Sequence, residues 1–254
     1  MASFLRRLRL TFAEGPTARP AGGAQCRYVA VIMDGNGRWA ARRHLPVAAG
    51  HRAGAKALRH IVEHALDCGI LELTAYSFST ENWARSPEEV ETLLQLFLEQ
   101  IATEVPEAQR RGARVRFIGR RAGLPQDLRE AMERAEAANR DDARMTFYIA
   151  LNYGSRAELL DATRALLEEQ RARRVEPAEV TEDDLRRHFY APEMHDPELL
   201  IRTSGEQRLS NFLLWQLAYA ELLFVPKLWP DFTPADLDEA LAVYARRQRR
   251  FGRR

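Results

Sequence analysis

The chain has 254 residues, of which 46% are hydrophobic, so it can build one domain with a sizeable core or two small domains. Its formal net charge of +2 gives no support to a general nucleic-acid binder, which carries a large excess of basic residues. Of the 38 basic residues 36 are arginines, and we attribute most of them to a GC-rich genome, so only particular arginines are candidates for ligand binding.

The chain opens with a predicted mobile leader, residues 1–27, ahead of one domain over residues 28–254. Residues 11–25 are rich in Gly, Pro and Ala. Residues 1–11 are basic and apolar, but they lack the apolar stretch and the cleavage site of a signal peptide. Two interpretations stay open for them, a frayed helix or a segment that rests on an anionic membrane surface.

From residue 28 onward, apolar runs of strand length alternate with helical patterns. Gly69 is placed to end one helix, and Pro87 after Ser86 is placed to begin the next. The predicted strands are residues 28–33, 71–78, 114–119, 145–153, 199–203 and 222–225. The predicted helices are residues 39–43, 51–68, 87 onward, 125–140, 155–173, 181–189 and 234–250. The alternation predicts a single α/β domain with a central, mainly parallel sheet flanked by helices.

Cysteine and histidine spacing gives little support to a metal site. Cys26 and Cys68 have neither the spacing of metal ligands nor that of a disulfide framework, so we expect a reduced, cytoplasmic setting. His60 and His64 share a helix face and could chelate a metal, but the sequence offers no third ligand, so surface or packing roles are preferred. No apolar run approaches the roughly 20 residues that span a bilayer.

Three polar clusters fall at the predicted carboxyl ends of strands, where open parallel sheets bind ligands. In the first, residues 34–38, two glycines let the backbone approach a ligand and backbone N–H groups can cradle an anion. Arg38 could clamp a phosphate, and Asp34 could hold a divalent cation against it. A plain turn is the alternative interpretation.

The second and third clusters add arginines and hydroxyl groups. In residues 77–85, capping would explain the hydroxyls and Asn82, but a turn needs neither an arginine nor two aromatic rings. In residues 202–211, Arg202 and Arg208 with hydroxyls between them suit a diphosphate, although a solvated loop remains the alternative. Glu221 lies in an apolar run, where a carboxylate must be paired or bound to a metal.

Together these clusters resemble the cis-prenyltransferases, whose bacterial members make undecaprenyl diphosphate. The resemblance extends from residue 29 to about residue 252, and no nucleotide-binding, serine-hydrolase or zinc-protease motif competes with it. The segments that carry it are residues 33–40, Gly50-His51, residues 78–83 with Arg85, residues 152–154, residues 202–212 and residues 219–221.

The resemblance implies a Mg²⁺-dependent, homodimeric enzyme that adds isopentenyl diphosphate units to an allylic diphosphate, usually farnesyl diphosphate, with the growing product in an apolar tunnel. By analogy Asp34 handles magnesium with Glu221, and Asn82 and Ser79 support proton removal. The isopentenyl diphosphate would be held by Arg202, Arg208 and Ser210. The other implied substrate-binding residues are Gly35, Asn36, Gly37, Arg38, Trp39, His51, Phe78, Trp83, Arg85, Arg250 and Gly252. A helix stripe at residues 93–101 and the strand at residues 71–75 are candidate walls for the product.

One departure from the family concerns Val47. The family generally carries an arginine after Leu-Pro, ahead of the Gly-His pair, whereas here Leu45-Pro46 is followed by Val47. The site then has one cation fewer unless Arg42 or Arg43 compensates, and this keeps open a synthase of short or medium chains. A non-catalytic subunit of such an enzyme is a further alternative, but it would be expected to lose the aspartate and the arginines that this chain keeps. Peripheral membrane contact during product release is also open, and no nucleic-acid partner is expected.

Overall fold

The computed structural model describes residues 25–173 and 176–247. Most of the predicted leader, residues 1–24, and the predicted substrate-binding residues Arg250 and Gly252 therefore lie outside the described residues. Among the residues it describes, no helix combines the length and the apolar character that crossing a membrane requires.

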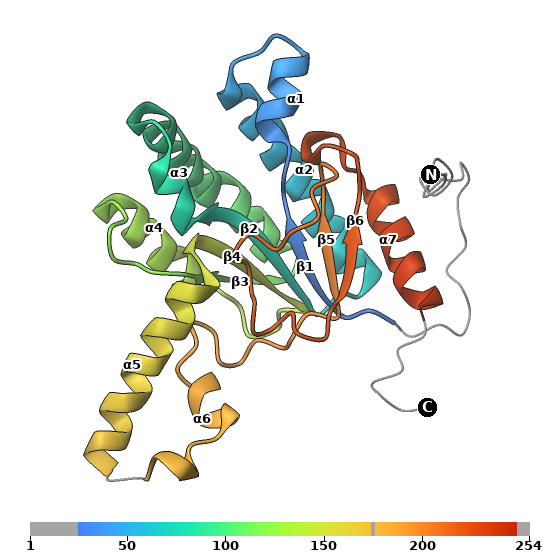
Figure 1. The fold of residues 1–254 in the computed structure, drawn as a ribbon. Helices are drawn as coiled ribbons and strands as arrows, with labels where there is room; N and C mark the ends of the chain where they lie inside the picture. Colours follow the sequence, from blue (N-terminus) through green and yellow to red (C-terminus); the bar gives the residue numbers. More distant parts are fainter. Residues whose placement is uncertain (1–24, 174–175, 248–254) are drawn as a thin grey trace, which may run out of the picture.

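Six parallel strands form the centre of the molecule in the order β3-β4-β2-β1-β5-β6 (Figure 1). They are β1 (Tyr28–Ile32), β2 (Glu72–Ser79), β3 (Ala113–Ile118), β4 (Met145–Tyr153), β5 (Leu199–Arg202) and β6 (Glu221–Phe224). The chain leaves β1 toward β2 on one side and returns to β5 on the other. The strand order therefore switches beside β1, which is where parallel sheets open a ligand crevice at their carboxyl ends.

The described chain has seven α-helices, which lie between the strands or after the last one, and two predicted end signals, at Ser86 and Gly69, are confirmed. Ser86 caps its helix, its hydroxyl oxygen accepting from the Glu89 N–H at 3.3 Å, and Gly69 ends another helix with a φ of 75°. The helices are α1 (Asn36–Arg42), α2 (Val47–Cys68), α3 (Pro87–Arg110), α4 (Gln126–Ala137), α5 (Ser155–Arg173), α6 (Glu182–Arg186) and α7 (Pro234–Arg246). The described chain also has three short 3₁₀ segments that were not predicted, namely η1 (Thr80–Ala84), η2 (Pro177–Glu179) and η3 (Trp229–Asp231).

The two faces of the sheet are covered differently. Alternate strand residues such as Val29 and Val31 join the core under α2, α3, α4 and α7. The residues between them, such as Ala30 and Ile32, pack against the irregular segments around Met194 and Phe212. The predicted parallel α/β sheet is confirmed, with long helices on one face and mainly loop segments on the other, while α5 projects beside the sheet (Figure 1).

Candidate active site

The carboxyl ends of β1, β2 and β5 bring the three polar clusters into one cleft of about 760 Å³. The parallel sheet explains the convergence, because residues that directly follow neighbouring strands must meet at one edge. The predicted site residues that line this cleft are Asp34, Gly35, Asn36, Gly37, Arg38, His51, Ser79, Asn82, Arg85, Arg202, Arg208 and Ser210.

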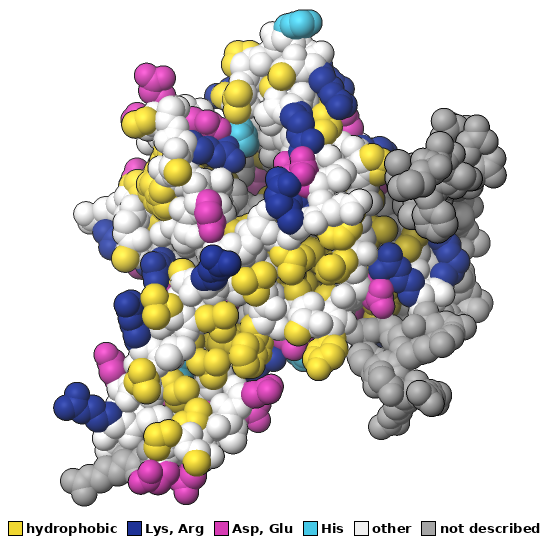
Figure 2. Space-filling model, in the orientation of Figure 1, with side chains coloured by type: hydrophobic (Ala, Val, Ile, Leu, Met, Phe, Trp, Pro, Cys, Tyr) yellow, Lys and Arg dark blue, Asp and Glu magenta, His cyan; other side chains and the backbone are white. Residues whose placement is uncertain are grey.

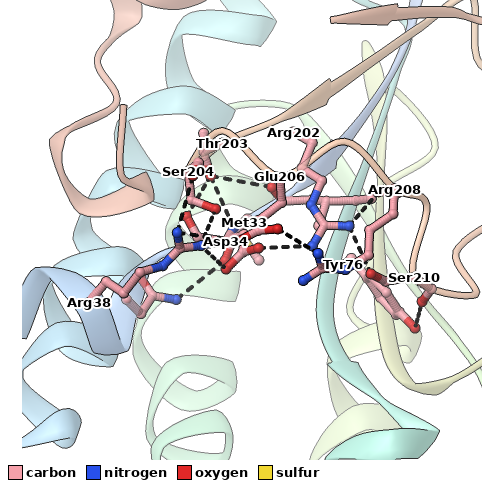
Figure 3. Close-up of polar contacts among 12 residues, drawn as sticks. Met33, Asp34, Arg38, Tyr76, Arg202, Thr203, Ser204, Glu206, Arg208 and Ser210 are labelled. Carbon is pink, nitrogen blue, oxygen red and sulfur yellow. Dashed lines mark hydrogen bonds and ion pairs between the residues drawn. The ribbon is translucent and has the colours of Figure 1, made fainter. Parts of the chain in front are cut away.

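Asp34 lies between two arginines that approach it from opposite sides (Figure 3). Its Oδ2 accepts from Arg202 Nη2 at 2.9 Å, and its Oδ1 accepts from Arg38 Nη2 at 3.3 Å. The backbone of Asp34 is fixed as well, because its N–H donates to the Thr203 hydroxyl at 3.0 Å and its carbonyl accepts from that hydroxyl at 2.7 Å. The carboxylate is therefore held in one place with its charge balanced by cations.

Arg202 is the most deeply buried cation of the cleft, with 3% of its surface exposed. Its Nη1 donates to the Ser210 hydroxyl at 2.8 Å and to the Arg208 carbonyl. Its Nε is buried and has no hydrogen-bond partner within the described part of the chain. A buried guanidinium with an unsatisfied donor is suited to bind an oxyanion, which would complete its hydrogen bonds.

The loop after β5 holds its residues in a strained backbone. Ser204, Ser210, Asn211 and Leu213 have φ values of 77°, 49°, 62° and 44°, the left-handed region that residues other than glycine seldom adopt. Such strain is typical of loops that hold side chains for binding or catalysis. In this loop the Ser204 hydroxyl accepts from Arg38 Nη2 at 2.5 Å.

Asp34 and His51 are two of the ionisable groups in the cleft whose pKa values are shifted. Burial alone would raise the pKa of Asp34, but hydrogen bonds from Arg202 and Ser204 and the charges of Arg202 and Arg38 outweigh it, so the pKa lies below its ordinary value. Burial, together with the Arg85 charge, lowers the pKa of His51. At neutral pH the site therefore presents a carboxylate and a neutral imidazole.

The second cluster is organised by its own hydrogen bonds. The Asn82 Oδ1 accepts from the Ser79 N–H at 2.9 Å in a reciprocal capping arrangement at the start of η1. Glu81 then joins this cluster to the third one, because its Oε1 accepts from Asn211 Nδ2 at 2.8 Å.

Three predicted aromatic residues do not line the cleft. The Trp39 indole N–H donates to Asp231 at 2.7 Å, and the guanidinium of Arg43 stacks on the same ring at 4.1 Å. Phe78 is a buried core residue, with its ring centroid 5.3 Å from that of Trp83. Within the described chain these rings support the walls of the site rather than face the polar cleft.

Glu221 begins β6 at the level of Leu199, at the end of the sheet that lies away from the cleft. Its carboxylate accepts from Arg247 Nη1 at 2.7 Å. This ion pair gives the carboxylate the partner that its place in an apolar run requires. Within one chain the structure therefore does not bring Glu221 to Asp34.

Val47 lines the cleft as the first residue of α2. Arg42 and Arg43, which could compensate for the missing family arginine, do not line the cleft. Arg42 is exposed, and Arg43 pairs with Asp231 at 3.2 Å. The cleft therefore has an apolar side chain where the family generally has a cation.

An apolar cavity of about 70 Å³ lies between α2, α3 and the sheet. Phe97 and Ile101 of the predicted stripe line it, but the sheet contributes Phe117, Phe147 and Ile149 from β3 and β4 rather than residues 71–75 of β2. Residues 71–75 do not line this cavity, because β3 and β4 contribute its sheet side.

Several residues of the cleft were not predicted as site residues, and some of them lie inside the three clusters. Ser77 and Glu81 belong to the second cluster, and Asn211 belongs to the third. Tyr76 precedes the second cluster, and its hydroxyl donates to the Ser210 carbonyl at 3.2 Å. Glu89 of α3 was not predicted, and Leu93 was predicted only as a wall for the product. The packing of α3 brings both to the cleft.

Residues 32–252 match the prenyltransferase family model that is described for undecaprenyl diphosphate synthases. An isoprenyl transferase from Thermotoga maritima is 49% identical over 226 residues, which cover 89% of this chain and 96% of that protein. A ditrans,polycis-undecaprenyl-diphosphate synthase of Xanthomonas axonopodis pv. citri, specific for (2E,6E)-farnesyl diphosphate, is 46% identical and covers 89% of this chain and 88% of its own. Among solved structures, lavandulyl diphosphate synthase from Lavandula x intermedia, in complex with dimethylallyl diphosphate, matches with a TM-score of 0.86 and 36% identity, covering 90% of this chain and 98% of its own.

Proposed function

The chain belongs to the cis-prenyltransferases, the family of the undecaprenyl diphosphate synthases, and we propose that it extends farnesyl diphosphate with isopentenyl diphosphate units to undecaprenyl diphosphate. That product is the precursor of the lipid carrier used in bacterial wall and peptidoglycan synthesis. The observation that carries the proposal is Asp34, held between Arg38 and Arg202 in a cleft that shares Ser77 with an apolar cavity.

The cations of the cleft would bind the diphosphate groups of the two substrates. Gly35, Asn36, Gly37 and Arg38 would bind the allylic diphosphate, with neutral His51 as a further hydrogen-bond donor. Apart from its chain neighbours and the backbone of its own helix, no described atom lies within 4 Å of a Cβ built on Gly37, so this position is open to a ligand. Arg202, Arg208 and Ser210 would bind the diphosphate of isopentenyl diphosphate.

The Asp34 carboxylate fits Mg²⁺. It is ionised at neutral pH, and Mg²⁺ is bound in proteins through one or two carboxylates together with substrate phosphates. When bound, the ion would neutralise charge on the departing diphosphate. Arg38 and Arg202 stabilise the same developing charge from fixed positions, which is where preorganised cations contribute most.

Carbon–carbon bond formation requires loss of the allylic diphosphate, attack by the alkene of isopentenyl diphosphate and removal of one proton. Ser79 and Asn82 lie in the cleft and hold each other through the capping arrangement. We assign them to proton removal by positioning the acceptor, as the family resemblance implies.

The growing chain would enter the apolar cavity between α2 and α3. Each five-carbon unit gains roughly 4 kcal/mol by leaving water, at about 0.8 kcal/mol per carbon. The cavity of about 70 Å³ is smaller than the ~150 Å³ that holds a benzene molecule, so the product must part the two helices as it grows. The ion pairs Arg59–Glu104 at 3.6 Å and Arg111–Glu63 at 2.9 Å join the α2 region to the α3 region there, and they would open first.

The exposed apolar surface around α5 supports a homodimer. On α5, Leu167 is 64% exposed and Leu160 is 46% exposed, and Tyr219, just before β6, is 81% exposed. Hydrophobic side chains gather over α5 and the surface beside it (Figure 2). Large exposed apolar patches mark interfaces in proteins of this size, and we assign this one to a second copy of the chain. Arg250 and Gly252 would then contribute to substrate binding, and we place the protein in the cytoplasm with peripheral membrane contact at product release.

The test is incubation of the protein with farnesyl diphosphate, labelled isopentenyl diphosphate and Mg²⁺, followed by chromatographic sizing of the product. We expect a product of eleven isoprene units and near-complete loss of incorporation in Asp34→Ala, with circular dichroism unchanged. Full incorporation by Asp34→Ala would refute the mechanism. A shorter product would favour a synthase of short or medium chains, which Val47 keeps as the second candidate, and no incorporation by the wild type would favour a non-catalytic subunit.

A further inference from the structure

A second cluster of metal-ligating side chains lies far from the cleft, where the last turn of α2 meets the beginning of α7. It consists of His64, Cys68 and Asp238, whose ligand atoms all lie within 4.8 Å of one another. His64 and Cys68 are one helical turn apart on α2, and Asp238 comes from α7. From His51 in the cleft, Cys68 is 17 residues away along α2, or about 25 Å at 1.5 Å per residue.

The three side chains converge on a single point. His64 Nε2 lies 2.8 Å from Asp238 Oδ1 and 3.4 Å from Cys68 Sγ, and Cys68 Sγ lies 3.7 Å from Asp238 Oδ1. In a nucleophilic triad the carboxylate binds the imidazole nitrogen that faces away from the nucleophile. Here the thiol and the carboxylate contact the same nitrogen, so the arrangement does not fit a proton relay.

The same geometry fits a tetrahedral metal site. Zinc–sulfur bonds of ~2.3 Å and zinc–nitrogen or zinc–oxygen bonds of ~2.0–2.1 Å place neighbouring ligand atoms ~3.3–3.6 Å apart. Two of the three separations, 3.4 and 3.7 Å, are already close to those values, and the third, 2.8 Å, needs to open by only about half an ångström. One thiolate, one imidazole and one carboxylate form a donor set that zinc accepts.

We propose that His64, Cys68 and Asp238 form a binding site for Zn²⁺ or a similar soft divalent metal that joins α2 to α7. The side chain of Asp238 is 49% exposed, so the site has an entry path and room for a water molecule as fourth ligand. The thiol of Cys68 gives up its proton when the metal binds. The metal would cross-link two helices that pack against each other and would leave the Mg²⁺-dependent cleft unchanged.

The experiment uses the full chain, freed of metal with a chelator and titrated with Co²⁺ and then Zn²⁺. We expect one Co²⁺ per chain with a sulfur-to-cobalt absorption band in the near ultraviolet, which Zn²⁺ abolishes on displacing it. Zn²⁺ at 100 times its Kd should raise the Tm by roughly 5 to 10 °C, given 2 to 4 °C for each kcal/mol in a chain of this size.

Matched variants distinguish this site from other metal-binding groups. Cys68→Ser and His64→Gln should lose the band and the rise in Tm, whereas Cys26→Ser and His60→Gln should keep both. Because Cys68 is buried and its variant can fail to fold, Asp238→Asn on the exposed side provides a second test, with at least a tenfold weaker Co²⁺ affinity expected. Absence of the band in the wild type, or its persistence in Cys68→Ser or His64→Gln, would overturn the proposal. Prenyl transfer in zinc-free buffer with Mg²⁺ is measured separately, so failure of the proposed function would not count against this site.

Discussion

Replacing Val47 by arginine tests whether this position controls the affinity for the allylic substrate. Val47 is the first residue of α2, lines the cleft and is 44% exposed, so a guanidinium can be accommodated there without displacing core residues. We expect Val47→Arg to lower the KM for farnesyl diphosphate and to leave kcat unchanged, because a cation that binds the diphosphate before and during reaction contributes uniform binding.

The size of the effect follows from the partial exposure of the position. Two unit charges 4 Å apart attract by about 1 kcal/mol in water and about 4 kcal/mol near a protein surface. Ordering a long side chain costs about 1–2 kcal/mol. The net gain is then about 1–2 kcal/mol, or a roughly 5- to 30-fold lower KM. In the free protein the same charge at a helix N-terminus costs about 0.3–1 kcal/mol, so the Tm without substrate should fall slightly.

Steady-state kinetics with farnesyl diphosphate at saturating isopentenyl diphosphate measure the effect. Val47→Leu, which adds volume without charge, is the matched control, and the benefit of Val47→Arg should shrink as salt is raised. An unchanged KM in Val47→Arg, or an equal fall in Val47→Leu, would refute the reasoning.

Three further predictions follow from the same geometry. The pKa of Asp34 is lower in the folded protein than in the unfolded chain, where it is about 3.9. The carboxylate therefore stabilises the fold at pH values above about 3.9, and this stabilisation is lost as the pH falls through the pKa of the folded state. The difference in unfolding free energy between wild type and Asp34→Asn should therefore be larger at pH 7 than in strong acid, and a constant difference would contradict the ion pair with Arg202. Gly35→Ala should lower the unfolding free energy by about 1–3 kcal/mol in denaturant titrations, because the φ of Gly35 is 111° and the new Cβ would lie 2.8 Å from the Leu228 side chain. A variant as stable as the wild type would contradict this strain. Ala108→Leu narrows the apolar cavity and should shorten the product on sizing chromatography, while unchanged chain length would place the growing chain elsewhere.

The strands and the motifs could be predicted from the sequence because they depend on residues that are close together in the chain. β4 and α5 begin and end where predicted, since Gly154 separates an apolar run from a helical one. The convergence of the clusters around Asp34 and Arg202 was also predictable, because strands that run parallel end at the same edge.

The contacts that could not be predicted join residues far apart in the chain. Asp231 binds the Trp39 indole across 192 positions, and Asp238 meets His64 across 174. No local pattern encodes such pairs, because they depend on how helices pack against one another. Cys68 illustrates this, since its spacing from His64 was visible in the sequence but the third ligand was not.

The unbroken length of α2 limits how the sequence of this protein can change. Its 22 residues run about 33 Å, from Val47 at the cleft, past Leu58 and Val62 at the apolar cavity, to Cys68. Inserting or deleting one residue within it would turn everything downstream by about 100° and shift it by about 1.5 Å. The apolar face would then leave the cavity while the first turn stayed in place. Insertions and deletions among related chains should therefore fall in the segments before and after α2, and substitutions within it should preserve its register.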